Sequence, residues 1–134
     1  MEKIYSKVEP GKLLHIVHRR DEIRRREDLV PPGEALQVSC FELEKGKTFK
    51  PHKHLLLDKV SHITQESWIV VQGAVMAILY DLDDTELVRP VLKPGDCSIT
   101  LYGGHNYVSL EENTLVYEYK TGPYFGQEKD KAFL

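Results

Sequence analysis

Residues 66–81 have the sequence ESWIVVQGAVMAILYD, in which two apolar runs flank the pair Gln72-Gly73. Both runs are rich in the aliphatic, aromatic and β-branched residues that fit a pleated sheet. Gln72-Gly73 has the composition of a tight turn, since glycine tolerates backbone angles that other residues avoid. This stretch therefore predicts two β-strands, 67–72 and 75–81, that are joined by a turn.

The same pattern extends in both directions from this stretch. Short apolar segments alternate with turn-forming clusters such as Lys93-Pro94-Gly95-Asp96 and Gly103-Gly104. The further predicted strands are 36–43, 48–54, 87–92, 97–101, 107–110 and 115–120. Evenly spaced short strands without intervening helices are typical of a sandwich or a barrel, so we expect an all-β protein.

The segments outside these strands are more polar. The arginines at 19, 20 and 24–26 are interleaved with acidic residues, and the pairs Asp21/Arg25 and Glu22/Arg26 have the i,i+4 spacing of a helix. We therefore expect a short, solvated helical turn in this charged N-terminal segment, which Pro31-Pro32-Gly33 would end. An anion-binding patch is the alternative. Residues 122–134 combine turn residues and charges, and we expect them to run over the surface or across a partner subunit.

Length and composition limit the class of protein. The 134 residues suit one domain, 1–134, with a core barrel at about 36–120. A net charge of −3 does not favour nucleic acid as a partner. The absence of a long apolar run or a signal-peptide pattern predicts a cytoplasmic protein that does not enter membranes. Cys40 and Cys97 lie in separate apolar runs and are interpreted as reduced core residues, with a disulfide as the alternative.

Four residues have the character of metal ligands. His52 and His54 are two apart in a predicted strand, so both imidazoles point to the same face. Glu66 begins the next strongly apolar strand, and His105 follows Gly103-Gly104. Three imidazoles and one carboxylate suit a divalent transition metal such as Fe, Mn, Ni or Zn. The other histidines, at 15, 18 and 62, are interpreted as hydrogen-bonded structural residues.

The spacing of these residues resembles the motifs of the cupin superfamily. Gly46, His52, His54, Glu66 and Gly73 are similar to the first cupin motif, and Gly95-Asp96 with Gly103-Gly104-His105 is similar to the second. The resemblance covers about three quarters of the chain. It implies a single small cupin jelly-roll β-barrel in which His52, His54, Glu66 and His105 bind one divalent metal ion.

The chain departs from the family pattern at three places. Eleven residues, 55–65, separate the second histidine from Glu66, which enlarges the hairpin loop. Leu101 stands where the family has proline, and His105 comes about one residue early, with Asn106 directly after it. A slip of one residue in a strand turns a side chain to the other face. In that case Glu66, His52 and His54 would form a triad without His105.

Period two places Trp68 on the face of Glu66 and Tyr107 on the face of His105, which predicts either an aromatic pocket wall or simple core filling. Tyr107 and Glu118 are the candidate catalytic residues. Trp68, Tyr117 and His62 are the candidate substrate contacts, and His62 lies in the enlarged loop.

Cupins serve many functions, so the resemblance does not fix a reaction. We expect a small metal-dependent enzyme, of the isomerase, epimerase or oxygenase type, that acts on a sugar, nucleotide sugar or small oxygenated metabolite. The likeness of residues 65–73 to sugar-modifying cupins of cell-surface polysaccharide pathways favours a role in carbohydrate metabolism. The alternatives are a binding module without catalysis and a metal-free isomerase or epimerase that uses His and Tyr as acid and base. A homodimer is expected in each case.

Overall fold

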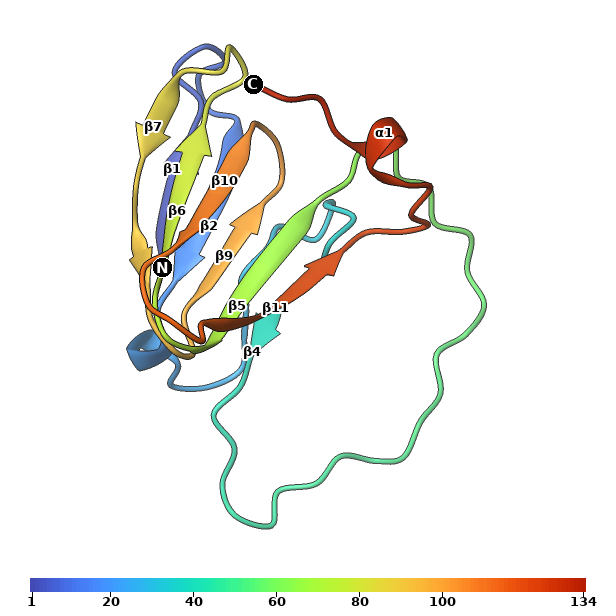
Figure 1. The fold of residues 1–134 in the computed structure, drawn as a ribbon. Helices are drawn as coiled ribbons and strands as arrows, with labels where there is room; N and C mark the ends of the chain where they lie inside the picture. Colours follow the sequence, from blue (N-terminus) through green and yellow to red (C-terminus); the bar gives the residue numbers. More distant parts are fainter.

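The computed structural model describes residues 1–134 and consists mainly of antiparallel β-strands (Figure 1). The prediction of an all-β protein is therefore confirmed. The helical elements are one 3₁₀ turn, η1 (Arg20–Glu22), and one short helix, α1 (Gln127–Asp130). The strands are β1 (Glu2–Tyr5), β2 (Leu13–His18), β3 (Glu27–Asp28), β4 (Ser39–Cys40), β5 (Glu66–Gln72), β6 (Val75–Tyr80), β7 (Glu86–Val88), β8 (Val91–Leu92), β9 (Cys97–Thr100), β10 (His105–Ser109) and β11 (Leu115–Lys120).

The strands form two main sheets and one small ladder. One sheet has the order β1-β2-β9-β5-β11, and the other has the order β10-β6-β7, with β8 also pairing with β6. The two-stranded ladder consists of β3 and β4. None of these sheets closes on itself, so the architecture is that of an open two-sheet assembly, and the jelly-roll barrel stays a prediction.

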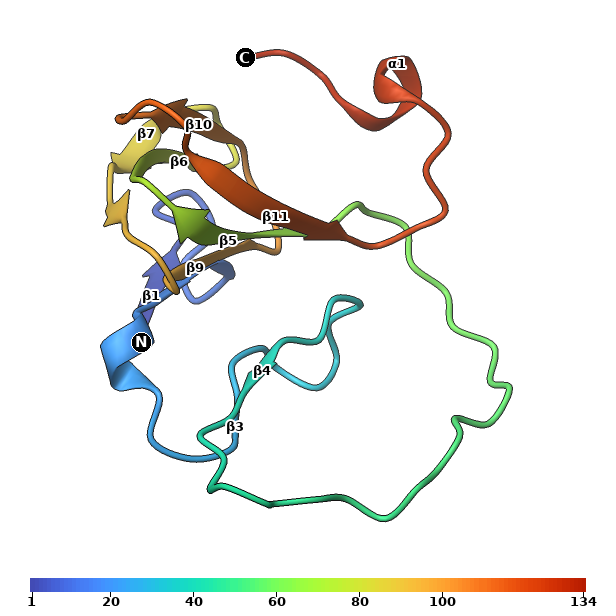
Figure 2. The same ribbon diagram turned by 60° about the horizontal axis from the view of Figure 1, so that its bottom comes forward.

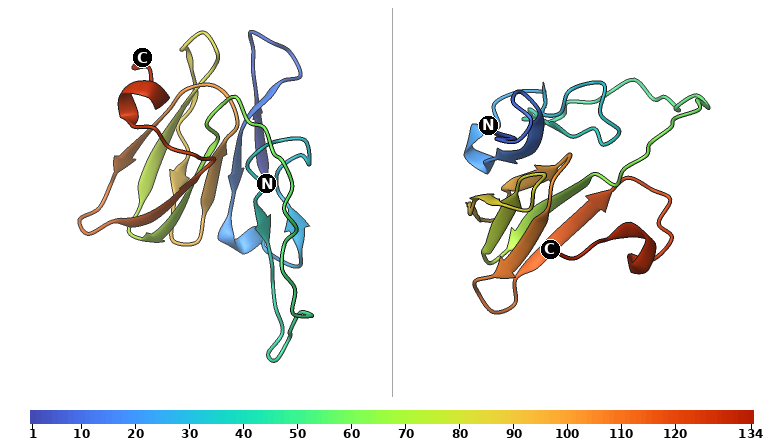
Figure 3. Two further views of the ribbon diagram at one scale, coloured as in Figure 1. Left: turned by 90° about the vertical axis from the view of Figure 1, so that its right-hand side faces the viewer. Right: turned by 90° about the horizontal axis from the view of Figure 1, so that it is seen from above.

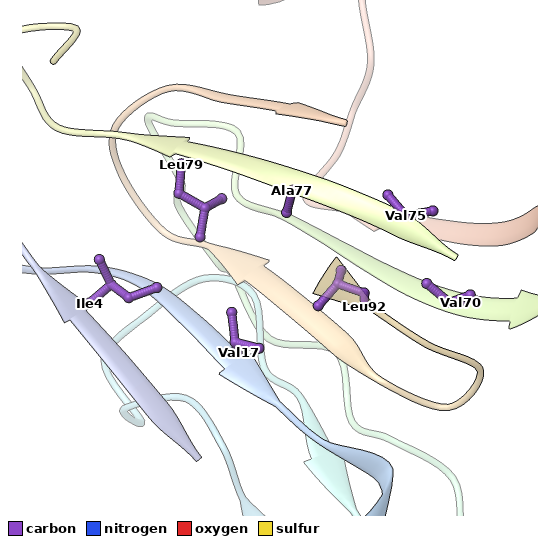
Figure 4. Packing of buried hydrophobic residues seen from close by; sticks show 7 residues of the cluster. All are labelled: Ile4, Val17, Val70, Val75, Ala77, Leu79 and Leu92. Atoms are coloured by element: carbon purple, nitrogen blue, oxygen red, sulfur yellow. The ribbon is translucent and has the colours of Figure 1, made fainter. Parts of the chain in front are cut away.

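The two main sheets face each other across an apolar core (Figure 4). Val75, Ala77 and Leu79 alternate along β6 and point to this core, and Val17 and Val70 approach it from the other sheet. Each fully buried valine or leucine among them contributes roughly 1.5–3 kcal/mol relative to an exposed one. This alternation fixes the register of β6, because a shift by one residue would turn all three side chains away from this core.

The outer face of the five-stranded sheet is covered as well. Residues 23–40, which carry β3 and β4 and are here called the arm, lie against this sheet (Figure 2). Leu29 and Val30 of the arm are buried together with Ile16 of β2 and Ile99 of β9. Because both faces of the sheet are covered, all four residues of β9 are buried.

Six of the eight predicted strands are present with bounds within two residues, although 87–92 is divided into β7 and β8 around Arg89-Pro90. Two predictions are wrong. Residues 48–54 form no strand, and 36–43 shortens to β4. Residues 41–63 run as an extended loop away from the sheets (Figures 1 and 3), where no neighbouring strand satisfies their backbone groups.

The N-terminal part differs most from the prediction. Sequence reasoning missed β1 and β2, which form a hairpin at the edge of the larger sheet. The expected helical turn is reduced to η1, and the i,i+4 ion pairs are not formed. Glu22 instead accepts hydrogen bonds from the amino group of Met1 and from the backbone N–H of Arg19. Asp96 accepts bonds from Arg19 and from the backbone N–H of Arg20, which ties this turn to the β8–β9 connection.

The C-terminal segment returns to the opening between the two sheets. After β11 the chain passes through α1, and residues 131–134 run back toward the end of β6 (Figure 1). Its course over the surface of its own domain agrees with one of the two predicted alternatives. No helix of the structure is long and apolar enough to cross a membrane.

Candidate functional site

A pocket of about 740 Å³ opens between the two sheets, under the C-terminal segment. This volume lies within the range of small-molecule sites. Strands β5, β10 and β11 supply its chemically active side chains, and Phe133 and Leu134 add apolar surface from the C-terminal segment. The titratable and aromatic residues that line it are Glu66, Trp68, Tyr80, Asp81, Asp84, His105, Tyr107, Glu118, Asp130, Lys131 and Phe133.

Glu66 lies at the start of β5 and is only 3% exposed. Its Oε1 accepts a hydrogen bond of 2.8 Å from the indole N–H of Trp68 and lies 3.1 Å from Nε2 of His105. Burial alone would raise the pKa of Glu66, but the hydrogen bond and charge of His105, together with the indole bond, lower it below its ordinary value. Glu66 is therefore a carboxylate at neutral pH.

His105 begins β10, opposite Leu79 of β6. Because the Glu66 carboxylate can only accept a hydrogen bond, Nε2 of His105 carries the proton in this contact. In the neutral imidazole the lone pair is then on Nδ1. Nδ1 is buried and has no hydrogen-bond partner. The contact with Glu66 thus fixes the orientation of the His105 ring and leaves Nδ1 as a buried nitrogen without a partner.

Two aromatic rings form a wall beside this pair. The rings of Trp68 and Tyr107 are stacked, with centroids 4.0 Å apart and an angle of 12° between their planes. The hydroxyl of Tyr107 lies 2.9 Å from Oγ of Ser98. Burial is the main cause that raises the pKa of Tyr107, so its phenol stays protonated and acts as a donor rather than as a base. Both rings line the pocket and also pack together.

Of the two candidate residues on strand β11, only Glu118 faces the pocket, and Tyr117 does not. Glu118 lines the pocket, and Nζ of Lys120 lies 3.3 Å from its carboxylate. Tyr117 is 62% exposed and does not line the pocket. The alternation of side chains along a strand accounts for this difference.

His52 and His54 lie in the extended loop and are exposed. Their ring centroids are 5.6 Å apart, and Nδ1 of His52 contacts the backbone carbonyl of Lys50. No three of the four predicted metal ligands have their ligand atoms within 4.8 Å of one another. The structure thus brings Glu66 and His105 together but not His52 and His54.

His62 lines a separate pocket of about 190 Å³, between the loop and residues 121–130. His62 does not line the larger pocket.

The larger pocket contains two of the four predicted metal ligands, Glu66 and His105. A carboxylate and an imidazole whose Nε2 points to it are suitable ligands for one divalent transition metal ion, which would replace the proton between them. Two ligands do not complete a coordination shell, so Glu66 and His105 would need further donors.

His15 is a buried residue next to the site whose environment the sequence did not define. Its Nε2 lies 2.8 Å from the carbonyl oxygen of Tyr80, so Nε2 donates, and Nδ1 accepts from the hydroxyl of Thr100 at 3.0 Å. This agrees with the interpretation of His15 as a structural residue. Burial lowers its pKa to about 4, although the bond to Tyr80 acts in the opposite direction.

Gly103 allows the close approach at this point. Its φ of +77° favours glycine, and a Cβ there would lie 2.5 Å from the carbonyl oxygen of Tyr80. The Gly103-Gly104 pair thus turns the chain from β9 into His105.

A second group of ligand-type residues lies on the other side of the larger sheet. One ligand atom each from His18, Glu27 and Cys40 lie within 4.8 Å of one another, so this group could hold a metal ion. This group has no short-spacing sequence motif, because 21 residues separate His18 from Cys40. Cys40 and Cys97 are both free, as predicted.

Comparisons of the chain with known protein families, with curated proteins and with solved structures found no match.

Proposed function

We propose that this protein is a small cupin-type, metal-dependent enzyme that acts on a sugar, nucleotide sugar or other small oxygenated metabolite. The observation that carries the proposal is the contact between Glu66 and His105 inside a pocket with an aromatic wall. Buried, charge-coupled groups in a pocket are typical of sites of chemistry.

The pocket suits a ligand that is apolar on one face and rich in oxygen on another. The stacked rings of Trp68 and Tyr107 offer an extended apolar surface against which a sugar ring or a carbon skeleton can pack. Glu118 and Lys131 are charged groups of the same pocket and are suited to bind hydroxyl or carboxylate oxygens. This combination is the reason for favouring an oxygenated metabolite.

Glu66 has the role of orienting His105. The carboxylate keeps the proton on Nε2 and so fixes the orientation of the imidazole ring. The raised pKa of Tyr107 keeps its phenol protonated, so the hydroxyl can donate a hydrogen bond to a ligand. Glu118 is another carboxylate of the pocket and the candidate for a further proton transfer.

In the metal-dependent form Glu66 and His105 would hold the ion together with His52 and His54. Strand β10 pairs with β6 on one side, and its other edge has no strand partner. Residues 48–54 are the part of the extended loop predicted as a strand, and pairing with this free edge would bring His52 and His54 toward His105. When bound, the metal would supply Lewis-acid polarisation or, as iron, oxygen activation.

A metal-free isomerase or epimerase is the second candidate. It is favoured by the direct 3.1 Å contact, which by itself prepares His105 for acid–base catalysis. Full activity after removal of metal would select this candidate. Binding of a metabolite without turnover would instead select the non-catalytic binding module.

The experiment is ligand-observed NMR with a panel of sugars, nucleotide sugars and small hydroxy acids, followed by product analysis of each ligand that binds. The informative variants are Glu66→Gln and His105→Asn, and the matched control is Glu42→Gln, an exposed residue outside the pocket. We expect binding in the parent and the control, and weaker binding or no turnover in both pocket variants. Equal binding and turnover in all four proteins would contradict the proposal.

We also propose a homodimer, because β11 is an outer strand of its sheet and carries the exposed side chains of Tyr117 and Tyr119. Analytical ultracentrifugation tests this. A concentration-independent monomer mass would refute it.

A further inference from the structure

The end of β2 presents a buried histidine whose hydrogen-bonding capacity is not fully used. His18 is 2% exposed, and its Nε2 is buried without a hydrogen-bond partner. A buried polar atom without a partner costs free energy, and most such atoms in folded proteins are satisfied. The ring of His18 therefore has an unused nitrogen close to the arm that covers the sheet.

The arm places two further ligands next to this histidine. In the ladder of β3 and β4, Glu27 and Cys40 are direct cross-strand partners. Side chains of such partners lie on the same side of the ladder. One carboxylate oxygen, one thiol sulfur and one imidazole nitrogen of the three residues lie within 4.8 Å of one another.

We propose that His18, Glu27 and Cys40 form a zinc(II) site that is separate from the pocket between the sheets. Zinc accepts sulfur, imidazole and carboxylate ligands in tetrahedral geometry, at about 2.0–2.3 Å from each ligand atom. Small side-chain rotations bring the three ligands to that distance from one ion. Metal binding forms a bond from zinc to the Cys40 thiolate and releases the thiol proton to the solvent. Glu27 is exposed, which leaves the fourth position open to water.

The position of the site assigns it a structural effect. It joins β2 of the larger sheet to the arm whose Leu29 and Val30 cover the outer face of that sheet. A metal bond at this point holds the arm against the sheet. It also fixes the start of the extended loop, which follows Cys40 directly and carries His52 and His54.

Cobalt(II) is the probe for this site, because a cobalt–thiolate bond gives a charge-transfer absorption band that imidazole and carboxylate ligands do not give. The full-length protein, stripped of metal, is titrated with cobalt chloride and then with zinc chloride. We expect the band in the parent, its loss on addition of zinc, and its absence in Cys40→Ser. The matched control is Cys97→Ser, which removes the other free thiol and should retain the band.

Two further variants keep the test informative if a buried substitution disturbs folding. Glu27→Gln changes an exposed residue, and we expect it to weaken zinc binding roughly tenfold or more. Glu42→Gln, also exposed, should leave zinc affinity unchanged. Absence of the band in the parent, or its persistence in Cys40→Ser, would overturn the proposal.

The test is independent of the proposed enzyme site. The ligands proposed there are His52, His54, Glu66 and His105, none of which is a thiol. Glu66→Gln should therefore retain the cobalt–thiolate band whether or not the pocket binds a second metal.

Discussion

The burial of His15 predicts that the protein loses stability as the pH falls from 7 to 4.5. In the folded state His15 has a pKa of about 4, compared with 6.5 for an ordinary histidine. At a pH between these two pKa values the unfolded chain binds a proton at this histidine that the folded chain does not bind. The free energy of unfolding therefore increases with pH in this window and is fully gained above pH 6.5.

The magnitude follows from the pKa difference of about 2.5, at 1.36 kcal/mol for each pH unit. The full window corresponds to about 3 kcal/mol, and the part lost between pH 7 and pH 4.5 is about 2.5 kcal/mol. The physical cause is the removal of water from the imidazole, which outweighs the opposite effect of the hydrogen bond to the carbonyl of Tyr80.

Urea unfolding at pH 7 and pH 4.5 measures this effect, with His15→Gln as the test variant and His62→Gln as the control at a residue of the exposed loop. Glutamine does not titrate in this range, so His15→Gln should lose about 2.5 kcal/mol less than the parent between the two pH values. The control should match the parent. A His15 ring that titrates near pH 6.5 in a ¹H–¹³C NMR experiment would refute the reasoning.

Three further predictions concern single side chains. Gly103→Ala places a Cβ at a φ of +77° and 2.5 Å from a carbonyl oxygen, so it should lower the free energy of unfolding by roughly 1–3 kcal/mol or more. In the control Gly33→Ala the added Cβ meets no atom within 4 Å, so the free energy of unfolding should change by less than about 1 kcal/mol. Urea unfolding measures both variants. Leu79→Ala, in the core between the sheets, should cost about 2–5 kcal/mol by thermal or urea unfolding. Trp68→Phe keeps an aromatic face but removes the indole donor, so the pKa of Glu66 should rise. NMR titration of the Glu66 carboxyl carbon measures this pKa. An unchanged pKa would show that the indole hydrogen bond does not stabilise the carboxylate.

The strands that could be predicted are those whose partners are near in sequence or whose composition is unambiguous. The strands β5 and β6 have a clear turn at Gly73 between uninterrupted apolar runs, and both form as predicted, although they lie in different sheets. The strand β2 was missed because its sequence, LLHIVH, contains two histidines, and their burial depends on contacts with β9 and the arm. Residues 48–54 have strand-like composition, but composition does not supply a neighbouring strand.

The candidate site shows the same limit. Period two along β5 and β10 was sufficient to place Glu66 with Trp68 and His105 with Tyr107, and these four residues do line one pocket. The pairing of His52 and His54 with that pocket depends on the course of a long loop, which no local pattern determines. The cluster at His18, Glu27 and Cys40 arises from contacts between three strands and has no sequence motif.

The most direct test of the proposed enzyme site is elemental analysis of protein expressed with several transition metals present. It compares Cys40→Ser, which removes the proposed zinc ligand, with the double variants Cys40→Ser/Glu66→Ala and Cys40→Ser/His54→Ala. We expect about one equivalent of metal in Cys40→Ser and strong loss in both double variants. Folded Cys40→Ser protein without metal, or equal metal content in all three proteins, would contradict metal binding by Glu66 and His54.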